Sequence, residues 1–113
     1  MKVIHFLCRP KGRGMTGVSH VAGTTYRSEA WPISEGEAQE LIGGSIYLHE
    51  AKSKPSRIGG RILGYEVVTL DAADPAARKQ RIAFTFESSA EGRNVPWRGQ
   101  DHDMSMTSGV LDA

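Results

Sequence analysis

One segment near the end of the chain has the residue types of catalytic or metal-binding chemistry. It reads Gln100-Asp101-His102-Asp103, so an imidazole stands between two carboxylates. In such a cluster a carboxylate can orient the histidine, which then takes a proton from a nucleophile or a water molecule. The pattern predicts a small hydrolase or nuclease in which His102 works with Asp101 or with the distant His49.

The spacing of the histidines does not predict a metal site. Zinc ligands usually recur at fixed short spacings, such as two histidines separated by three residues on a helix. His20, His49 and His102 are far apart in the sequence and show no such spacing. We therefore predict no metal, and a plain surface loop is the alternative interpretation of residues 101–103.

Two basic segments have the composition of phosphate-binding loops. The first lacks the Gly-Lys-Ser/Thr ending of a P-loop, so it predicts a generic anion-binding loop and not a nucleotide-hydrolysing one. The formal net charge is only +1, so any basic face must come from local clustering. A solvated connection is the alternative for the second segment. The cations are Arg9, Lys11 and Arg13 in the first segment and Lys52, Lys54 and Arg57 in the second.

Four aromatic residues offer flat faces on which a nucleobase can stack: Tyr26, Trp31, Tyr47 and Trp97. Trp97 lies in a polar segment flanked by proline and glycine, and this loop setting favours binding, with a plug at one end of a barrel as the alternative. Trp31 precedes a proline at a helix entrance, where a lid over the core is an equally good interpretation. For His49, which ends an apolar run, a surface histidine is the alternative to a functional group.

The central stretch, residues 43–69, must position these side chains. It holds two apolar, β-branched and aromatic runs, Ile46–Leu48 and Ile62–Val68, joined by a polar loop too long for a tight hairpin. We predict that the two strands are neighbours. The glycines at 59, 60 and 64 predict a bulge, a bend or the close approach of another backbone.

The other elements follow from local signals. Ser34 with Glu37 fits a capping box, so we predict a helix over Glu35–Ile42 that Gly43 ends in a left-handed conformation. Strands are predicted at residues 2–8, more weakly at 18–26, and at 80–87. The predicted core comprises Ile46, Leu48, Ile62, Val67, Ile82, Phe84 and Phe86.

The length of 113 residues predicts a single domain. The one cysteine, Cys8, excludes an internal disulfide and is expected to pack as a small buried hydrophobe. No apolar stretch approaches the roughly 20 residues that span a bilayer. The N-terminal apolar run is too short for a signal peptide, so we expect a cytoplasmic protein without a membrane partner.

The order of these elements resembles the PUA-like superfamily, which includes PUA, ASCH, YTH and EVE domains. The matching residues lie between 31 and 69: a tryptophan, the capped helix, and two glycine-bounded strands. The first strand matches at Gly43, Gly44, Ile46 and Tyr47, and the second at Gly60, Ile62, Gly64 and Val68. The resemblance implies an α+β fold, a small mixed and mostly antiparallel β-barrel of five to six strands with one main helix. It also implies nucleic-acid binding and, for EVE-like and YTH-like members, a pocket for a modified or flipped base.

The hypothesis that accounts for most of these features is a non-catalytic module that binds DNA or RNA without a cofactor. The alternatives are the hydrolase or nuclease described above and a protein-interaction domain. The sequence gives no indication of the oligomeric state. The predicted binding residues are Arg9, Lys11, Arg13, Tyr26, Trp31, Tyr47, His49, Lys52, Lys54, Arg57, Trp97 and His102.

Overall fold

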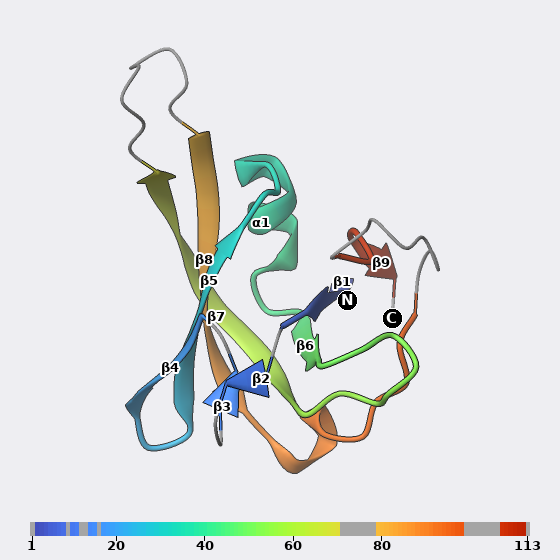
Figure 1. Ribbon diagram of the computed structural model, residues 1–113. Coiled ribbons are helices and arrows are strands. Elements are labelled where there is room, and N and C mark those ends of the chain that lie inside the picture. Colours follow the sequence, from blue (N-terminus) through green and yellow to red (C-terminus); the bar gives the residue numbers. More distant parts are fainter. Residues whose placement is uncertain are drawn as a thin grey trace.

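Figure 1 shows the computed structural model of the chain, which describes residues 2–8, 10–11, 14–15, 17–70, 79–98 and 107–112. These residues form a seven-stranded sheet, a two-stranded ribbon and one α-helix. The sheet contains β1 (Lys2–Leu7), β4 (Val18–Ala22), β5 (Thr25–Trp31), β6 (Ser45–His49), β7 (Ile58–Leu70), β8 (Lys79–Ser88) and β9 (Leu111–Asp112). The ribbon is β2 (Pro10–Lys11) with β3 (Gly14–Met15), the helix is α1 (Glu35–Leu41), and a 3-10 turn, η2, covers Ala90–Gly92.

The large sheet is mixed and mostly antiparallel, as predicted, but it is open. Its strand order is β4-β5-β8-β7-β6-β1-β9, and β1 and β6 run parallel. A closed barrel requires the two outermost strands to pair. Among the described residues β4 and β9 lie at opposite edges of the sheet, so the predicted barrel is wrong.

The number of strands also exceeds the predicted five to six. The segment predicted as one strand at residues 18–26 is a hairpin, because Gly23 turns the chain with a φ of +53°. The second arm of that hairpin, β5, continues to Trp31 and pairs with β8. At the other edge, Leu111 pairs with Val3 and adds β9.

The two central strands are neighbours, as predicted, and their glycines allow backbones to approach closely. β6 pairs antiparallel with β7, with Ile46 opposite Gly60. A Cβ atom on Gly60 would lie 1.8 Å from the carbonyl oxygen of Glu87 on β8, so no side chain fits there. The register of β7 against β8 shifts between Ile62 and Gly64, which is the predicted bulge.

The helix forms for the predicted reason and is one residue shorter than predicted. The Ser34 hydroxyl accepts a hydrogen bond from the Glu37 amide, and the Glu37 carboxylate accepts one from the Ser34 amide. Gly43 follows the helix with a φ of +81°, in the left-handed region. Ala38 and Leu41 face the sheet and are buried, so packing on the sheet stabilises this short helix.

The core lies between α1 and one face of the sheet. Six of the seven predicted core residues are buried, and Cys8 is buried with them. Val67 is the exception, with 37% of its surface exposed. It lies on β7 beyond Arg61, where β6 no longer pairs with the strand, so fewer neighbours cover it. No helix among the described residues is both long and apolar enough to cross a bilayer.

Candidate functional site

Several predicted site residues lie outside the described part of the chain. Arg9, Arg13 and His102 are among them, as are both aspartates beside His102. Lys11 is described only as a backbone position of β2. The hydrolase hypothesis based on His102 and the first basic segment therefore stay predictions from the sequence.

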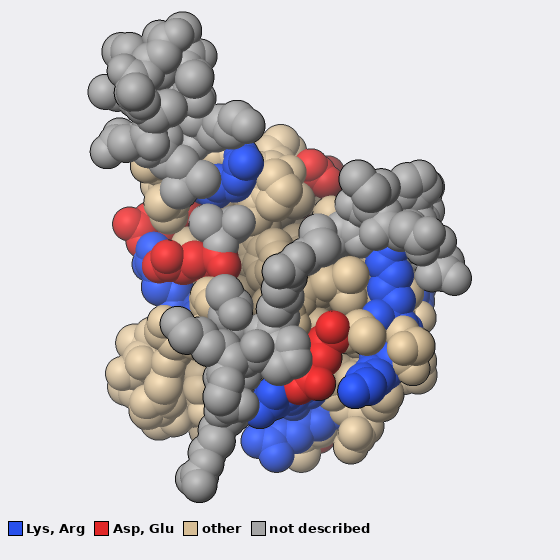
Figure 2. Space-filling model, viewed as in Figure 1, with Lys and Arg blue, Asp and Glu red and all other residues tan. Residues whose placement is uncertain are grey.

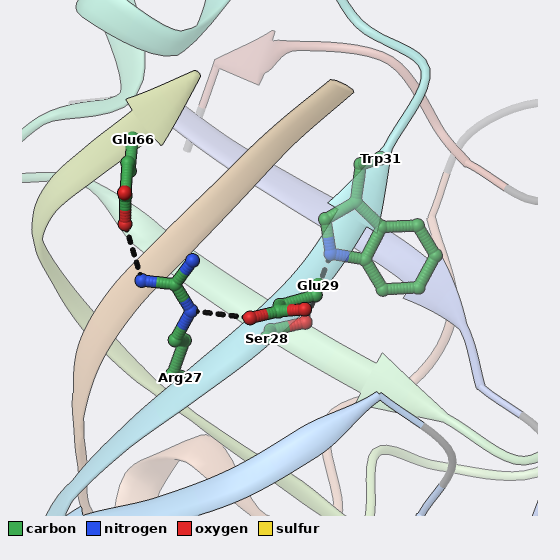
Figure 3. A network of polar contacts seen from close by, with 5 residues as sticks. All are labelled: Arg27, Ser28, Glu29, Trp31 and Glu66. Atoms are coloured by element: carbon green, nitrogen blue, oxygen red, sulfur yellow. Dashed lines mark hydrogen bonds and ion pairs between the residues drawn. The ribbon is translucent and has the colours of Figure 1, made fainter. Parts of the chain in front are cut away.

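Trp31 belongs to the core and is not available to stack on a base. Only 7% of its surface is exposed, and its ring stacks on Phe6 with centroids 4.0 Å apart. Its indole N–H donates a 2.8 Å hydrogen bond to the hydroxyl of Ser28, which is also buried (Figure 3). Arg27 and Glu29, on either side of Ser28, form an ion pair on the opposite face of β5. The register of β5 against β8 shifts between Ser28 and Trp31, which interrupts the alternation and lets Trp31 share the buried face with Ser28.

Tyr26 lies apart from the remaining predicted residues. It is half-buried on β5, where its ring packs against Phe86 on one side and His20 on the other. Because β5 is on the β4 side of the sheet, Tyr26 is separated from β6 by two intervening strands. Tyr26 is therefore not part of the same surface as the β6–β7 loop.

The structure brings the other predicted residues together around the loop between β6 and β7. Tyr47 and His49 lie on β6, Lys52, Lys54 and Arg57 belong to the loop, and Trp97 comes from the segment after η2. This grouping depends on contacts between segments that are about 40 residues apart in the sequence. It is the candidate functional site.

Ser56 holds the two segments of the site side by side. Its amide donates to the Val95 carbonyl oxygen at 2.8 Å, and its hydroxyl accepts from the Val95 amide at 3.0 Å. The same hydroxyl donates to the Gly92 carbonyl oxygen at 2.7 Å, and the Ser56 carbonyl oxygen accepts from the Asn94 amide at 2.8 Å. Ser56 is buried, so these hydrogen bonds are shielded from water and place Trp97 against the loop.

Trp97 and two lysines share a shallow surface depression. It is lined by Lys52, Ser53, Lys54, Pro55, Pro96 and Trp97. The Lys52 ammonium nitrogen lies 5.5 Å from the centroid of the Trp97 ring, within the range of a cation–π contact. On the face shown in Figure 2, lysine and arginine side chains gather at the lower right, where the β6–β7 loop runs in Figure 1.

Arg57 adds less to the positive charge of this surface than its position suggests. Its guanidinium donates to the Glu50 carboxylate at 2.6 Å, and both side chains are partly buried. This ion pair closes the loop, together with the hydrogen bond from the Arg57 amide to the Leu48 carbonyl oxygen at 2.9 Å. The acidic partner offsets part of the attraction that Arg57 would exert on a phosphate.

A layer of histidines lies beneath Trp97, on the face of the sheet opposite the core. Side chains alternate along a strand, so His5 on β1 and His49 on β6 point away from the core residues Phe6 and Leu48. The His5 ring lies 4.9 Å from Tyr47, 5.0 Å from His49 and 5.6 Å from Trp97, measured between centroids. Both histidines are fully buried. We call His5, Tyr47, His49 and Trp97 the aromatic cluster.

The hydrogen bonds of the two histidines fix their tautomers. His49 Nδ1 lies 3.0 Å from the carbonyl oxygen of Lys54, which can only accept, so His49 Nδ1 carries the hydrogen and donates. In neutral His49 the other nitrogen, Nε2, is then an acceptor. It lies 2.8 Å from His5 Nδ1, which must donate. His5 Nε2 therefore carries a lone pair and no hydrogen.

Burial keeps both rings neutral. The pKa of His5 is lowered to about 4, chiefly by burial and to a smaller extent by the neighbouring His49 and Arg98. Burial also lowers the pKa of His49, against the opposing effect of its hydrogen bond to the Lys54 backbone. Neutral rings at pH 7 agree with the tautomers that the hydrogen bonds require.

Two polar atoms of the aromatic cluster are buried without a hydrogen-bond partner among the described residues. They are His5 Nε2, an acceptor, and Trp97 Nε1, which carries a hydrogen and can only donate. Leaving such a group unpaired costs about 1–3 kcal/mol, so buried polar groups nearly always find a partner. The pair is the strongest sign of a ligand in the described structure.

His5 was absent from the residues predicted for the site. The only sequence signal for it is a histidine in the middle of the apolar run KVIHFLC. The parallel pairing of β1 with β6 places His5 opposite Tyr47 and brings it near His49, which is 44 positions away. Without that non-local pairing, the run gives no reason to join the two histidines.

Two other kinds of chemistry receive no support from the described residues. Burial raises the pKa of the Cys8 thiol to about 12, so Cys8 is the predicted packing residue and a poor nucleophile. The described part of the chain holds no group of three or more histidine, cysteine and acidic side chains that could bind a metal ion.

Comparisons with known proteins do not assign this fold or site to a family. No protein-family model, no curated protein sequence and no solved structure matches the chain.

Proposed function

We propose that this protein is a non-catalytic nucleic-acid-binding module that holds a strand across the β6–β7 loop. The observation that carries the proposal is that Trp97, Lys52 and Lys54 line one shallow depression. Binding of single-stranded nucleic acid combines the same two elements, an aromatic face for a base and cations for the flanking phosphates. The resemblance of residues 31–69 to the PUA-like superfamily points to the same function and forms part of this proposal.

The geometry favours contact through bases and phosphates together. The depression is shallow and open, as a strand that passes over the surface requires. Lys54 is exposed beside Trp97, and its backbone carbonyl oxygen also holds His49 in place. The loop backbone is therefore fixed from below while Lys54 faces outward, which lowers the entropic cost of ordering the loop on binding.

The test is a titration of short single-stranded and double-stranded DNA and RNA at several salt concentrations. Each lysine–phosphate interaction that a substitution removes should reduce the slope of log affinity against log salt by about 0.7 for a single strand. The variant with both Lys52→Gln and Lys54→Gln should therefore bind more weakly and with a slope smaller by about 1.4.

The matched control is Arg81→Gln, which removes one cation from β8 at the far end of the β7–β8 pair, opposite Val68. It should leave the salt slope almost unchanged, because it changes the net charge without touching the depression. If the double lysine variant binds with the slope of the unmodified protein, or if Arg81→Gln has an equal effect, the proposed surface is not the binding surface.

A further inference from the structure

The unpaired atoms of the aromatic cluster define what a ligand must offer. His5 Nε2 needs a hydrogen-bond donor, and Trp97 Nε1 needs an acceptor. The two rings are neighbours, with centroids 5.6 Å apart, so one ligand that carries a donor beside an acceptor could serve both atoms. The surrounding rings of Tyr47 and His49 favour a flat ligand.

A phosphate does not meet this requirement. The phosphodiester of a nucleic-acid backbone offers acceptor oxygens but no hydrogen-bond donor, and the lone pair of His5 Nε2 repels its negative charge. The hydrogen-bonding edge of a nucleobase does meet it, because each standard base carries an N–H group beside an acceptor on that edge. This edge is free only when the base is unpaired.

We propose that His5 and Trp97 form a recognition pair for the hydrogen-bonding edge of an unpaired nucleobase. His5 Nε2 accepts from the N–H group of the base, and the Trp97 indole N–H donates to the adjacent acceptor. The inference rests on the proposed function, to which it adds the part of the nucleic acid that is read. The pair selects a base with a free, unmodified edge and does not select among the four bases.

Binding at this pair requires a local rearrangement. Both atoms are shielded from solvent in the free protein, although the Trp97 ring itself is partly exposed. Trp97 lies outside helix and strand, so its side chain can rotate without breaking the sheet. The histidines beneath it are held by the chain of hydrogen bonds that ends at the Lys54 carbonyl oxygen, so the acceptor stays fixed while the indole moves.

The two tryptophans allow a direct test by NMR, because each indole N–H gives its own resonance. The probes are a short oligothymidine strand, the same strand with abasic sites, thymidine as the free nucleoside, and its N3-methyl derivative, which lacks the ring N–H. We expect the intact strand to shift the Trp97 resonance and the abasic strand not to. The Trp31 resonance is an internal reference, because its N–H is already bonded to Ser28.

The matched variants are Trp97→Phe and Trp31→Phe, which remove one indole N–H each and keep an aromatic ring. Trp97→Phe should reduce the preference for the intact over the abasic strand by about two- to tenfold, the usual value of one hydrogen bond. Trp31→Phe should leave this preference unchanged. N3-methylation of the free nucleoside should abolish its effect on the Trp97 resonance.

The possible results separate this inference from the proposed function. Equal affinity for intact and abasic strands, with a normal salt slope, would overturn the recognition pair and leave the nucleic-acid proposal intact. Thymidine binding without binding of any strand would overturn the nucleic-acid proposal and support a small-molecule site for the same base edge. A Trp97 resonance that no probe shifts would mean that no base edge reaches the two atoms, which would overturn the inference.

Discussion

Lowering the pH should destabilise this protein through the histidine pair. The pKa of His5 is about 4 in the folded protein, against an ordinary value of 6.5. Between these two values the unfolded chain binds a proton that the folded protein does not bind. Stability therefore rises with pH in this window, and it falls as the pH drops from about 6.5 towards 4.

The magnitude follows from the two pKa values. Between about pH 7.5 and pH 5 the loss of unfolding free energy due to His5 alone is about 2 kcal/mol. His49, whose pKa is also lowered, adds to it in the same direction. Among the described residues, the charged and titratable groups near His5 are Tyr47, His49, Arg98 and, across the Trp97 ring, Lys52. A small domain is stable by about 5–15 kcal/mol, so the loss is measurable.

The assay is urea unfolding at a series of pH values in this range, followed by circular dichroism and tryptophan fluorescence. His5→Asn keeps an amide N–H near the position of Nδ1, so it can still donate to His49 while no longer titrating. Its unfolding free energy should be lower at pH 7.5 but should fall by about 2 kcal/mol less on acidification. His20→Gln is the control, because it replaces one histidine on the exposed strand β4 and leaves the buried histidine pair in place.

Two results would refute this reasoning. Unfolding free energy that is constant between about pH 7.5 and 5 would mean that water reaches the rings and that burial does not hold them neutral. An equal fall in the unmodified protein and in His5→Asn would place the titrating group elsewhere.

Three further predictions concern stability, and urea unfolding measures each of them. Phe84→Ala should cost about 3–5 kcal/mol because the ring is fully buried, whereas Val67→Ala, at an exposed position, should cost less than about 1 kcal/mol. Ser34→Ala should cost about 1 kcal/mol, because it removes the hydroxyl of the capping box, and no loss would mean that the helix begins elsewhere. Gly60→Ala should disrupt the β7–β8 pairing, since its Cβ would overlap the Glu87 carbonyl, whereas Gly64→Ala, where a Cβ meets nothing within 4 Å, should be tolerated.

The parts of the fold that the sequence predicts depend on local signals. The capping box, the left-handed Gly43 and the glycine-bounded strands each involve residues close together in the chain, and each prediction is confirmed. The closed barrel failed because closure depends on which distant strands pair. The sequence holds no local signal that β1 would pair with β6 or that residues 111–112 would cover the edge of β1.

The residues of the candidate site differ in the same way, since some follow from local signals and others depend on distant strands. Lys52 and Lys54 were predictable from the composition of one loop, and Trp97 from its loop setting. Trp31 has the same side chain as Trp97, but the pairing of β5 with β8 and the ring of Phe6 place it in the core. Side-chain type alone could not separate the two tryptophans, because their burial is decided by partners that are remote in the sequence.

The aromatic cluster gives a physical reason why stability and binding should be linked here. The face of the sheet beneath Trp97 holds two fully buried histidines, His5 and His49. Aliphatic residues would pack there without leaving an unpaired polar atom. Each histidine requires a hydrogen-bond partner, and the chain of bonds from the Lys54 carbonyl through His49 ends at a lone pair on His5. Well-packed apolar residues at these positions would avoid the penalties of burying polar groups. A ligand that donates to His5 and accepts from Trp97 would offset that cost, and it would therefore raise the stability of the folded protein on binding.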